Sequence, residues 1–211
     1  MRKRERALEA IKRLEEIYPD AICSLVYEDA FQLLIATRLS AQCTDKRVNM
    51  VTPDLFAEFP TAQKMAEADL SRVEELIKTC GFYKTKAKDL IGIANKIVSH
   101  FGGKVPNTIE ELTTLPGVGR KTANLVCGDI YKKPAVVTDT HFIRICNRLG
   151  LVDTDVPLKV ENEMRKLLPP DKSNDFCHRT VLFGRDTCVA RNPKCDICNL
   201  RDFCPKKIKK G

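Results

Sequence analysis

Four cysteines lie close together near the C-terminus of this 211-residue chain, in the segment CVARNPKCDICNLRDFC. Cys188, Cys195, Cys198 and Cys204 follow the spacing Cys-x6-Cys-x2-Cys-x5-Cys. Four thiolates so close in sequence suit one tetrahedral zinc ion or a cubane iron–sulfur cluster, whereas four free thiols would be prone to oxidation. The spacing therefore predicts a metal site but does not choose between zinc and iron.

A second candidate site is the segment TTLPGVGRKTANLV, at residues 113–126. Upstream of it, Thr108 and Glu111 form a capping box that predicts a short helix from Ile109 to about Thr114. Pro116 helps to end this helix. Gly117 and Gly119 then let the backbone turn sharply and approach a ligand without obstruction.

The helix after this turn is predicted to begin near Arg120, with one apolar face made of Ala123, Val126, Cys127 and Ile130. Lys121 lies almost opposite that face. A helix N-terminus reached through a glycine turn presents unpaired backbone amides, which suit a phosphate. The alternative is an ordinary helix–helix turn with a solvated lysine.

An acidic residue follows in KPAVVTDTHFIR, where Thr138, Asp139 and Thr140 supply cap residues for a helix starting near His141. The helix dipole favours the ionised form of a carboxylate at this place. From these residues alone, Asp139 is either an N-cap and nothing more or an acid with a chemical role.

Helices are expected to position these residues. The segments ERALEAIKRLEEIY, SRVEELIKTC and AKDLIGIANKIVSHFGG carry apolar residues at helical spacing, and the last ends on a glycine pair. Only KPAVVTDT resembles a strand. The pattern predicts an all-α fold with short loops.

Net charge of +8 and a pI near 9.0 favour a polyanionic partner. The basic N-terminal segment lacks the apolar stretch of a signal peptide, and no run approaches membrane-spanning length. We therefore expect a cytoplasmic protein, nucleoid-associated if prokaryotic, with no membrane partner. The six cysteines outside the C-terminal group are then expected to be small buried side chains and not disulfides.

LPGVGRKTA resembles the helix-hairpin-helix motif of the endonuclease III family of DNA base-excision glycosylases. LSAQCTDKRVN at 39–49 resembles the family's N-terminal signature, and VTDTHFIRICNRLG at 137–150 resembles its catalytic aspartate segment. The four cysteines follow its cluster pattern. These blocks occur in the family's order over nearly the full chain.

The resemblance implies a bifunctional DNA N-glycosylase and AP lyase of base excision repair. Lys121, as the free amine, is expected to attack the anomeric carbon of the damaged nucleotide's sugar. The base then departs, a Schiff base remains, and β-elimination nicks the strand on the 3′ side. Asp139 is expected to stabilise positive charge on the sugar and to help manage the proton of Lys121.

The implied partner is double-stranded DNA containing damaged bases or abasic sites, oxidised and ring-saturated pyrimidines above all, bound by a monomer. Because the target nucleotide must be flipped out, side chains must fill the gap. The resemblance nominates Gln42 and Phe82, for which the alternatives are a surface polar residue and a core aromatic. It also implies that the hairpin grips the DNA backbone through Gly117, Val118, Gly119 and Arg120. Weaker candidates for the substrate pocket are Ser40, Asp45 and His141.

The cysteine spacing is that of the family's 4Fe-4S cluster, so the resemblance favours iron with the four cysteines as ligands. The segment from 188 to 211 carries seven Lys or Arg against two Asp. Arg191 and Lys194 lie between the first two cysteines and are expected to contact DNA phosphates. The lysine-rich run at 206–210 is predicted to be a disordered tail.

The implied architecture is two helical domains with a DNA cleft between them. Residues 23–133 would form a six-helix barrel with the hairpin, and residues 1–22 and 134–211 the cluster domain, so that Lys121 and Asp139 meet across the boundary. Thr113 and Cys43 depart from residues common in the family and could alter lesion preference.

Two alternatives remain. A monofunctional adenine or mismatch-thymine glycosylase would share the hairpin, the aspartate and the cluster, but a lysine at position 121 argues against it. A non-enzymatic iron–sulfur DNA-binding or redox-sensing protein would make Lys121 and Asp139 incidental. Assays of the chemistry distinguish these alternatives from a glycosylase/lyase.

Overall fold

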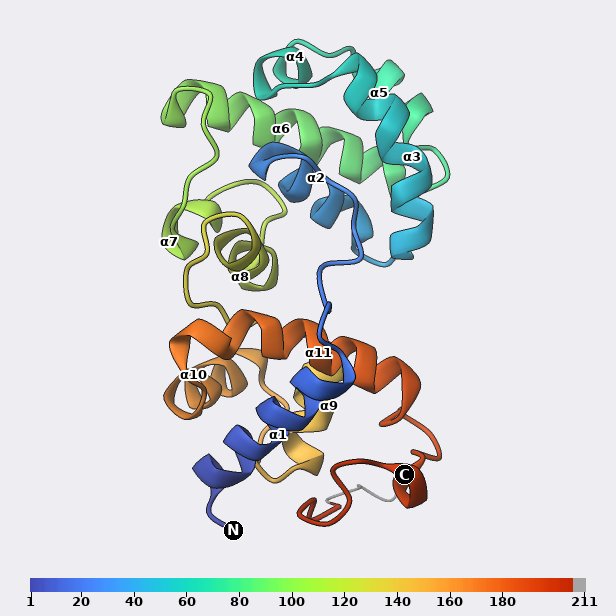
Figure 1. The fold of residues 1–211 in the computed structure, drawn as a ribbon. Coiled ribbons are helices and arrows are strands. Elements are labelled where there is room, and N and C mark those ends of the chain that lie inside the picture. The colour runs from blue at the N-terminus through green and yellow to red at the C-terminus, as the bar shows by residue number, and fades with distance from the viewer. Residues whose placement is uncertain (207–211) are drawn as a thin grey trace. The chain divides into compact units, whose positions relative to one another are not determined.

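The structure, a computed structural model, describes residues 1–206, and within this range the regular elements are all helical (Figure 1). The all-α prediction is therefore confirmed. KPAVVTDT, the one strand-like segment, forms an irregular connection. Most of the predicted disordered tail lies outside the described residues.

The chain divides into two compact units. The first, here called the hairpin unit, runs from Cys23 to Tyr131; the second, the cluster unit, combines Met1–Ile22 with the chain from Lys132 onward. The DNA cleft expected between two domains stays a prediction.

The hairpin unit contains α2 to α8. Their bounds are α2 Ala30–Ser40, α3 Asp45–Glu58, α4 Ala62–Ala66, α5 Leu70–Leu76, α6 Tyr83–Phe101, α7 Ile109–Leu112 and α8 Arg120–Asp129. Helix α2 packs against α3, α6 and α8 (Figure 1). Its apolar side chains are almost all buried: Phe31, Leu33, Leu34, Ile35, Ala36 and Leu39. Burial of each large one contributes roughly 1.5–3 kcal/mol, so α2 is the core of this unit.

A lysine is buried in the same core. The Lys86 side chain of α6 is only 1% exposed, and its Nζ donates a hydrogen bond of 2.7 Å to the carbonyl of Leu39. Burial lowers the pKa of this ammonium group. The contact ties α6 to the C-terminal turn of α2, where carbonyls lack partners inside the helix.

The cluster unit contains α1 Lys3–Ile17, α9 Thr140–Arg148, α10 Pro157–Leu167 and α11 Ser173–Asp186, with 3-10 turns at Pro170–Lys172 and Cys195–Ile197. Helix α11 packs against α1 and α9. Phe142 and Phe176 join α9 to α11 edge to face, with ring centroids 6.0 Å apart.

Side-chain caps explain where several helices begin. The capping residues are Asp29 for α2, Thr44 for α3, Thr61 for α4, Asp69 for α5, Thr108 for α7 and Asp139 for α9. Each accepts a hydrogen bond from a backbone amide in the first turn, which contributes about 1 kcal/mol. Over the part of the chain that the structure describes, no helix is long and apolar enough to span a bilayer.

Candidate functional site

The hairpin turn follows α7 directly. Thr108 caps α7 by accepting a hydrogen bond from the Glu111 amide, but the Glu111 carboxylate bonds to the Thr108 hydroxyl and not to its backbone amide, so only half of the predicted capping box forms; α7 ends at Leu112, two residues before the expected end. The chain tightens there because the Thr113 and Thr114 hydroxyls bond back to carbonyls of the short helix. The amide of Val118 then bonds to the carbonyl of Leu115.

Proline and glycine shape this turn. Pro116 and Gly117 occupy its two central positions, and Gly117 has φ +64°. A proline followed by a residue with positive φ is typical of a type II turn. The Val118 side chain is 6% exposed, so any contact with DNA at this residue is limited to its backbone.

A cradle of side chains from α2 and α6 supports the turn. A Cβ on Gly117 would stand 2.8 Å from Asp89 Oδ2 and would clash with Arg38 Nε. Arg38 and Asp89 form an ion pair, with Nε 2.9 Å from Oδ2. On α6, Gly92 leaves room for Pro116, and Lys96 Nζ donates to the carbonyl of Thr114 at 2.8 Å.

Sequence reasoning missed this cradle. One signal was available, because Arg38 is the one charged residue in the otherwise apolar and polar-neutral α2 segment AFQLLIATRLS. A charge in a helix whose neighbours are buried indicates a partner that the sequence alone does not identify.

The N-terminus of α8 lies at the exit of the turn. Gly119 is the N-cap with φ −96° and ψ 175°, and it provides no side-chain cap. A Cβ built on Gly119 would meet no other atom of the described chain within 4 Å. Arg120 and Lys121 are exposed. Amides of the first turn are therefore presented to an approachable surface, as an anion site requires.

The two nominated gap-filling residues lie on adjacent loops. Gln42 and Phe82 are both exposed and both have positive φ, 51° and 59°. A Cβ on Gly81 would stand 3.4 Å from the Gln42 carbonyl, so the loops are in contact. Phe82 is 69% exposed, and the alternative of a core aromatic is therefore wrong. The gap-filling role of both residues stays a prediction.

The weaker pocket candidates have intramolecular partners. Ser40 Oγ donates to the carbonyl of Thr37 at 2.9 Å, within α2. Asp45 Oδ2 accepts a hydrogen bond of 2.6 Å from Ser24 Oγ. The first contact lies within the last turn of α2, and the second joins Ser24 to the first residue of α3. A role in binding substrate stays a prediction.

Asp139 caps α9, as its position in the sequence predicts. Oδ1 accepts a hydrogen bond of 2.7 Å from the amide of Phe142. His141, in the first turn, lies with Nδ1 3.2 Å from Arg144 Nη2 and packs against Gly184 of α11. Burial lowers the pKa of His141, which the charge of Asp139 partly opposes. His141 thus has a clear structural role between α9 and α11.

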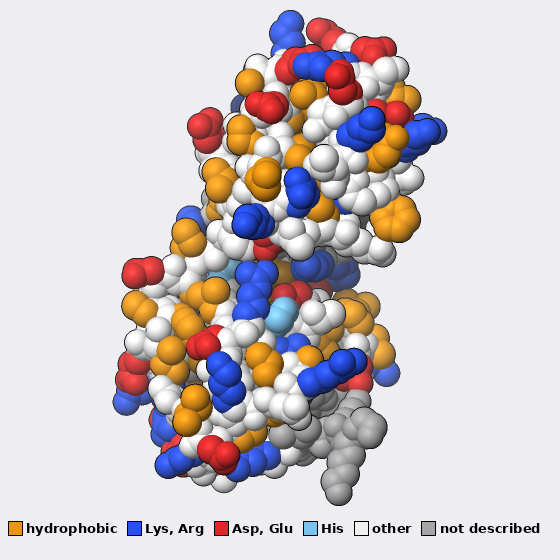
Figure 2. All heavy atoms as spheres, turned by 90° about the vertical axis from the view of Figure 1, so that its right-hand side faces the viewer, with side chains coloured by type: hydrophobic (Ala, Val, Ile, Leu, Met, Phe, Trp, Pro, Cys, Tyr) orange, Lys and Arg blue, Asp and Glu red, His pale blue; other side chains and the backbone are white. Residues whose placement is uncertain are grey.

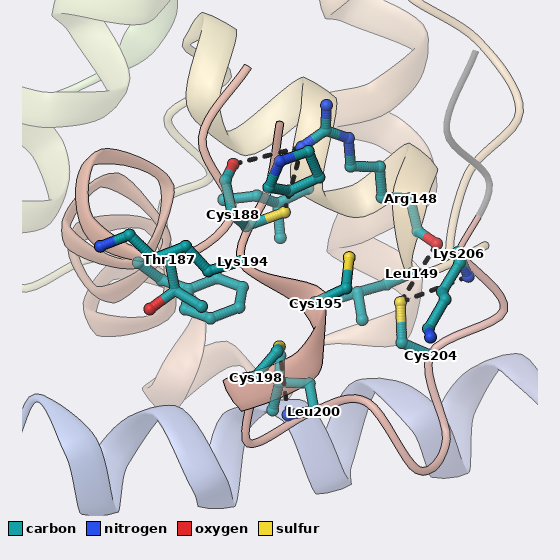
Figure 3. Close-up of a pocket in the computed structure, with 13 residues that line it drawn as sticks. Arg148, Leu149, Thr187, Cys188, Lys194, Cys195, Cys198, Leu200, Cys204 and Lys206 are labelled. Atoms are coloured by element: carbon teal, nitrogen blue, oxygen red, sulfur yellow. Dashed lines mark hydrogen bonds between the residues drawn. The ribbon is translucent and has the colours of Figure 1, made fainter. Parts of the chain in front are cut away.

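The four C-terminal cysteines line one pocket (Figure 3). Among residues 1–206, no three His, Cys, Asp or Glu side chains are grouped as the ligands of one metal ion. Tetrahedral zinc would need four sulfurs about 2.3 Å from one ion. Cysteines that hold a 4Fe-4S cluster each bind a different iron, so sulfurs spread around a pocket fit a cluster better.

Hydrogen bonds to sulfur also fit thiolate ligands. Backbone amides of Leu200 and Lys206 point at the sulfurs of Cys198 and Cys204, each at 3.4 Å. Burial raises the pKa of both thiols. A bound cationic group would oppose this rise and favour thiolates at these two positions.

Arginines from outside the cysteine loop hold it in place. Arg148, 8% exposed, donates to the carbonyls of Val189 and Ala190 at 2.7 and 2.8 Å and to Cys188 Sγ at 3.4 Å. Arg144 donates to the Cys188 carbonyl at 2.9 Å. At the other end of the loop, Arg13 of α1 pairs with Asp202 and lies over the Phe203 ring. The sequence does not reveal these partners, although positions 144 and 148 share a helix face.

The two basic residues of the cysteine loop are exposed, as DNA contacts would have to be. Arg191 is exposed, and Lys194 is exposed with Nζ 3.6 Å from Asp186 Oδ1. On the face drawn in Figure 2, basic side chains are interspersed with acidic and hydrophobic ones. Net charge alone therefore does not identify a DNA-binding surface on this face.

Comparison with known proteins decides the family. Residues 35–170 match the HhH-GPD superfamily base excision DNA repair protein family, and residues 188–204 match the iron-sulfur binding domain of endonuclease III. Endonuclease III of Synechocystis sp. is 47% identical over 204 residues, which cover 96% of this chain and 93% of that protein. The chain belongs to the endonuclease III family.

Other members of the endonuclease III family agree. The Escherichia coli enzyme is 38% identical over 96% of both chains. A solved structure of a trapped endonuclease III–DNA covalent intermediate has 37% identity and a TM-score of 0.91, covering 98% of this chain and 97% of that one. A thermostable thymine-DNA glycosylase, 23% identical with a TM-score of 0.85, shares the fold.

These matches confirm several predictions from the sequence. The chain is a base-excision-repair DNA glycosylase/AP lyase that binds DNA, and its cofactor is a 4Fe-4S cluster. Zinc at the cysteines is therefore ruled out in favour of iron.

Gly117 and Gly119 have different surroundings, so alanine substitutions at the two positions are expected to lower the free energy of unfolding by different amounts. Gly117→Ala is expected to lower the free energy of unfolding by about 2–4 kcal/mol, because it adds left-handed strain and displaces the Arg38–Asp89 pair. Gly119→Ala should cost about 1 kcal/mol or less, the difference between Gly and Ala at an N-cap. Denaturant unfolding of both variants measures this difference, and equal costs would contradict the described turn.

Proposed function

We propose that Lys121 is the nucleophile of a combined glycosylase and lyase reaction. One observation carries this proposal: Lys121 is exposed in the first turn of α8, directly after the open, glycine-lined N-terminus of that helix. A phosphate bound by the α8 amides would bring the adjoining sugar within reach of this side chain. A covalent endonuclease III–DNA intermediate has been trapped for a relative 37% identical in sequence, which supports covalent chemistry here.

The proposed reaction forms and breaks the following bonds. The free amine of Lys121 forms a bond to C1′ of the damaged nucleotide while the bond from C1′ to the base breaks, and the base leaves with a proton. The sugar ring then opens to a Schiff base between Nζ and C1′. Loss of a proton from C2′ breaks the C3′–O bond, which nicks the strand, and water finally releases the lysine.

Asp139 is proposed to assist both stages. Its carboxylate would stabilise positive charge on the sugar as the base departs, and it would accept or return the lysine proton. The hydrogen bond from the Phe142 amide fixes the position of Oδ1, and Oδ2 is not used by this cap. A capping role therefore leaves one carboxylate oxygen for chemistry.

DNA binding is proposed to rely on the backbone of the hairpin, on Arg120, and on Arg191 and Lys194 of the cysteine loop. These groups would contact phosphates and would not read base sequence, as suits an enzyme that searches all DNA. Gln42 and Phe82 are proposed to fill the gap left by a flipped nucleotide. Both side chains are exposed, and they lie on loops that touch, which supports a shared role at one gap in the base stack.

The proposed substrates are oxidised and ring-saturated pyrimidines in duplex DNA, together with abasic sites, and the proposed active form is a monomer. Ser40, Asp45 and His141 are proposed to adjoin the substrate pocket. The four cysteines that line the pocket of Figure 3 are proposed as the cluster ligands. The cluster would shape the loop that carries Arg191 and Lys194, and the bond-breaking steps would fall to protein side chains.

Borohydride trapping tests the nucleophile. Wild-type protein incubated with a duplex containing thymine glycol or an abasic site is expected to give a covalent adduct, because borohydride reduces the Schiff base to a stable amine. Lys121→Gln should give none. Lys64→Gln, which removes an exposed lysine from α4, is the matched control and should trap like wild type.

The two DNA substrates separate possible failures of that experiment. An adduct with abasic DNA but not with thymine glycol would reject the proposed lesion and keep the lyase chemistry. Base release without any adduct in the wild type would reject the Schiff base and favour a monofunctional glycosylase.

Substitutions at Asp139 can separate capping from catalysis. Asparagine caps helices about as well as aspartate, whereas alanine at an N-cap costs about 1 kcal/mol. Asp139→Asn is therefore expected to keep the unfolding free energy but to lower the single-turnover rate about 10²–10⁴-fold, since it loses an acid–base group. A fully active Asp139→Asn variant would reduce Asp139 to a cap.

Loss of a cluster ligand should be visible spectroscopically. Cys195→Ser is expected to lose most of its bound iron and its visible iron–sulfur absorbance, because a serine oxygen is a poor substitute for a thiolate. Cys23→Ser, outside the cysteine loop, serves as the control and should retain both. Unchanged iron content in Cys195→Ser would remove Cys195 from the ligand set.

A further inference from the structure

The cradle beneath the hairpin turn has no assigned role. It consists of Arg38 at the end of α2 and of Asp89, Gly92 and Lys96 on α6. The three α6 residues follow the spacing i, i+3, i+7 and so share one helix face. All four contact the segment 114–117. This face of α6 is thus shaped to receive the turn.

The ion pair is the part of the cradle closest to the glycine. Both Nε and Nη2 of Arg38 donate to Oδ2 of Asp89, and the two side chains are 15% and 21% exposed. Gly117 passes over them so closely that a methyl group would clash with both. The position of the turn is therefore set by the position of the pair.

The hairpin turn also determines the position of the α8 N-terminus. Two residues separate Gly117 from Arg120, and Val118 is anchored in the core. Helix α7, with four residues, is too short to hold the turn through its own stability. A shift of the Arg38–Asp89 pair would therefore move the amides that face the proposed phosphate.

We propose that Arg38 and Asp89 are positioning residues for DNA binding, which act through Gly117 on the α8 N-terminus and do not contact DNA themselves. This inference rests on the proposed role of the hairpin in gripping phosphate. It adds a chain-specific determinant of DNA affinity that lies beneath the binding surface.

Asp89→Asn gives the decisive test, because simple electrostatics and positioning predict opposite results. Removal of an acid makes the protein more basic, which by itself strengthens DNA binding. Loss of the ion pair should instead let the turn shift and weaken binding. We expect the Kd for a duplex with a tetrahydrofuran abasic analogue to rise about tenfold, a typical size for coupled residues.

Arg38→Met should behave in the same way, and its methionine keeps most of the apolar stem. The control is Arg72→Met, since Arg72 also pairs with carboxylates, Glu58 and Glu75, in the same unit but away from the hairpin. It should leave the Kd within about twofold of wild type. Single-turnover strand cleavage at saturating abasic DNA should also stay close to wild type in Arg72→Met, since the ion-pair partners of Arg72 lie outside the hairpin turn and α8.

A double-mutant cycle with Gly119→Ala tests whether Asp89 affects DNA affinity through the hairpin. A methyl group at Gly119 faces open space, so it hinders DNA approach without disturbing the cradle. If Asp89 acts through the hairpin, Asp89→Asn in the Gly119→Ala background should add little further loss of affinity. Additive losses would mean a route that bypasses the hairpin, and this would overturn the proposal.

Other outcomes are equally clear. Tighter DNA binding by Asp89→Asn would mean that net charge and not positioning governs the effect, and this would also overturn the proposal. Kd values like wild type in both Asp89→Asn and Arg38→Met would do the same. Failure of the proposed function would appear differently, as absent base release or trapping by the wild type, so the two failures are distinguishable.

Discussion

The shape of the hairpin turn and of the α8 N-terminus depends on one constraint. The backbone at Gly117 must pass directly over the partly buried ion pair of Arg38 and Asp89. A four-residue helix and a tight turn bury too little apolar surface to be stable by themselves. The α7–α8 connection acquires a fixed shape only because Leu115 and Val118 enter the core and because α2 and α6 support the turn from below. A polar support suits this place, since a carboxylate and a guanidinium restrict geometry more tightly than apolar side chains do.

The cluster unit also contains a segment that cannot hold its own shape, the cysteine loop, and arginine side chains hold it in place. From Cys188 to Lys206 the only regular element is a single 3-10 turn, so this stretch cannot fix its own shape. Arg144 and Arg148 hold its first residues through carbonyl groups, and Arg13 holds its last residues through Asp202 and Phe203. Guanidinium groups can satisfy several carbonyls at once, which explains why arginine occupies these three positions. The arginines order both ends of the loop, and the cluster orders its middle.

Features specified by neighbouring residues could be predicted from the sequence. The N-cap at Thr108, the glycine turn and the N-cap at Asp139 depend on contacts within a few residues, and the cysteine spacing encodes its own geometry. Features specified by distant residues could not. Arg38 and Asp89 are separated by 51 positions, and Arg13 meets Asp202 across 189. The exposure of Phe82 was also undecided, because an aromatic residue at a helix start fits a core as well as a surface.

Phe82 and Gln42 are exposed residues whose backbone conformations are unfavourable for the stability of the fold. Both occupy left-handed backbone conformations, which cost a non-glycine residue on the order of 1–3 kcal/mol, and Phe82 leaves most of its ring in water. Within residues 1–206, neither side chain makes a hydrogen bond that would offset this cost. The surrounding structure enforces both conformations: the buried Lys86 ammonium holds the end of α2 just before Gln42, and it lies on α6, the helix that Phe82 caps. The hydrogen bond from Lys86 to the carbonyl of Leu39 thus connects the two helix ends that adjoin these residues, and the buried side chains of α2 surround it. Two adjoining helix ends that are tied together in this way suit the gap-filling role proposed for Gln42 and Phe82, because side chains that enter a base stack need a fixed backbone behind them.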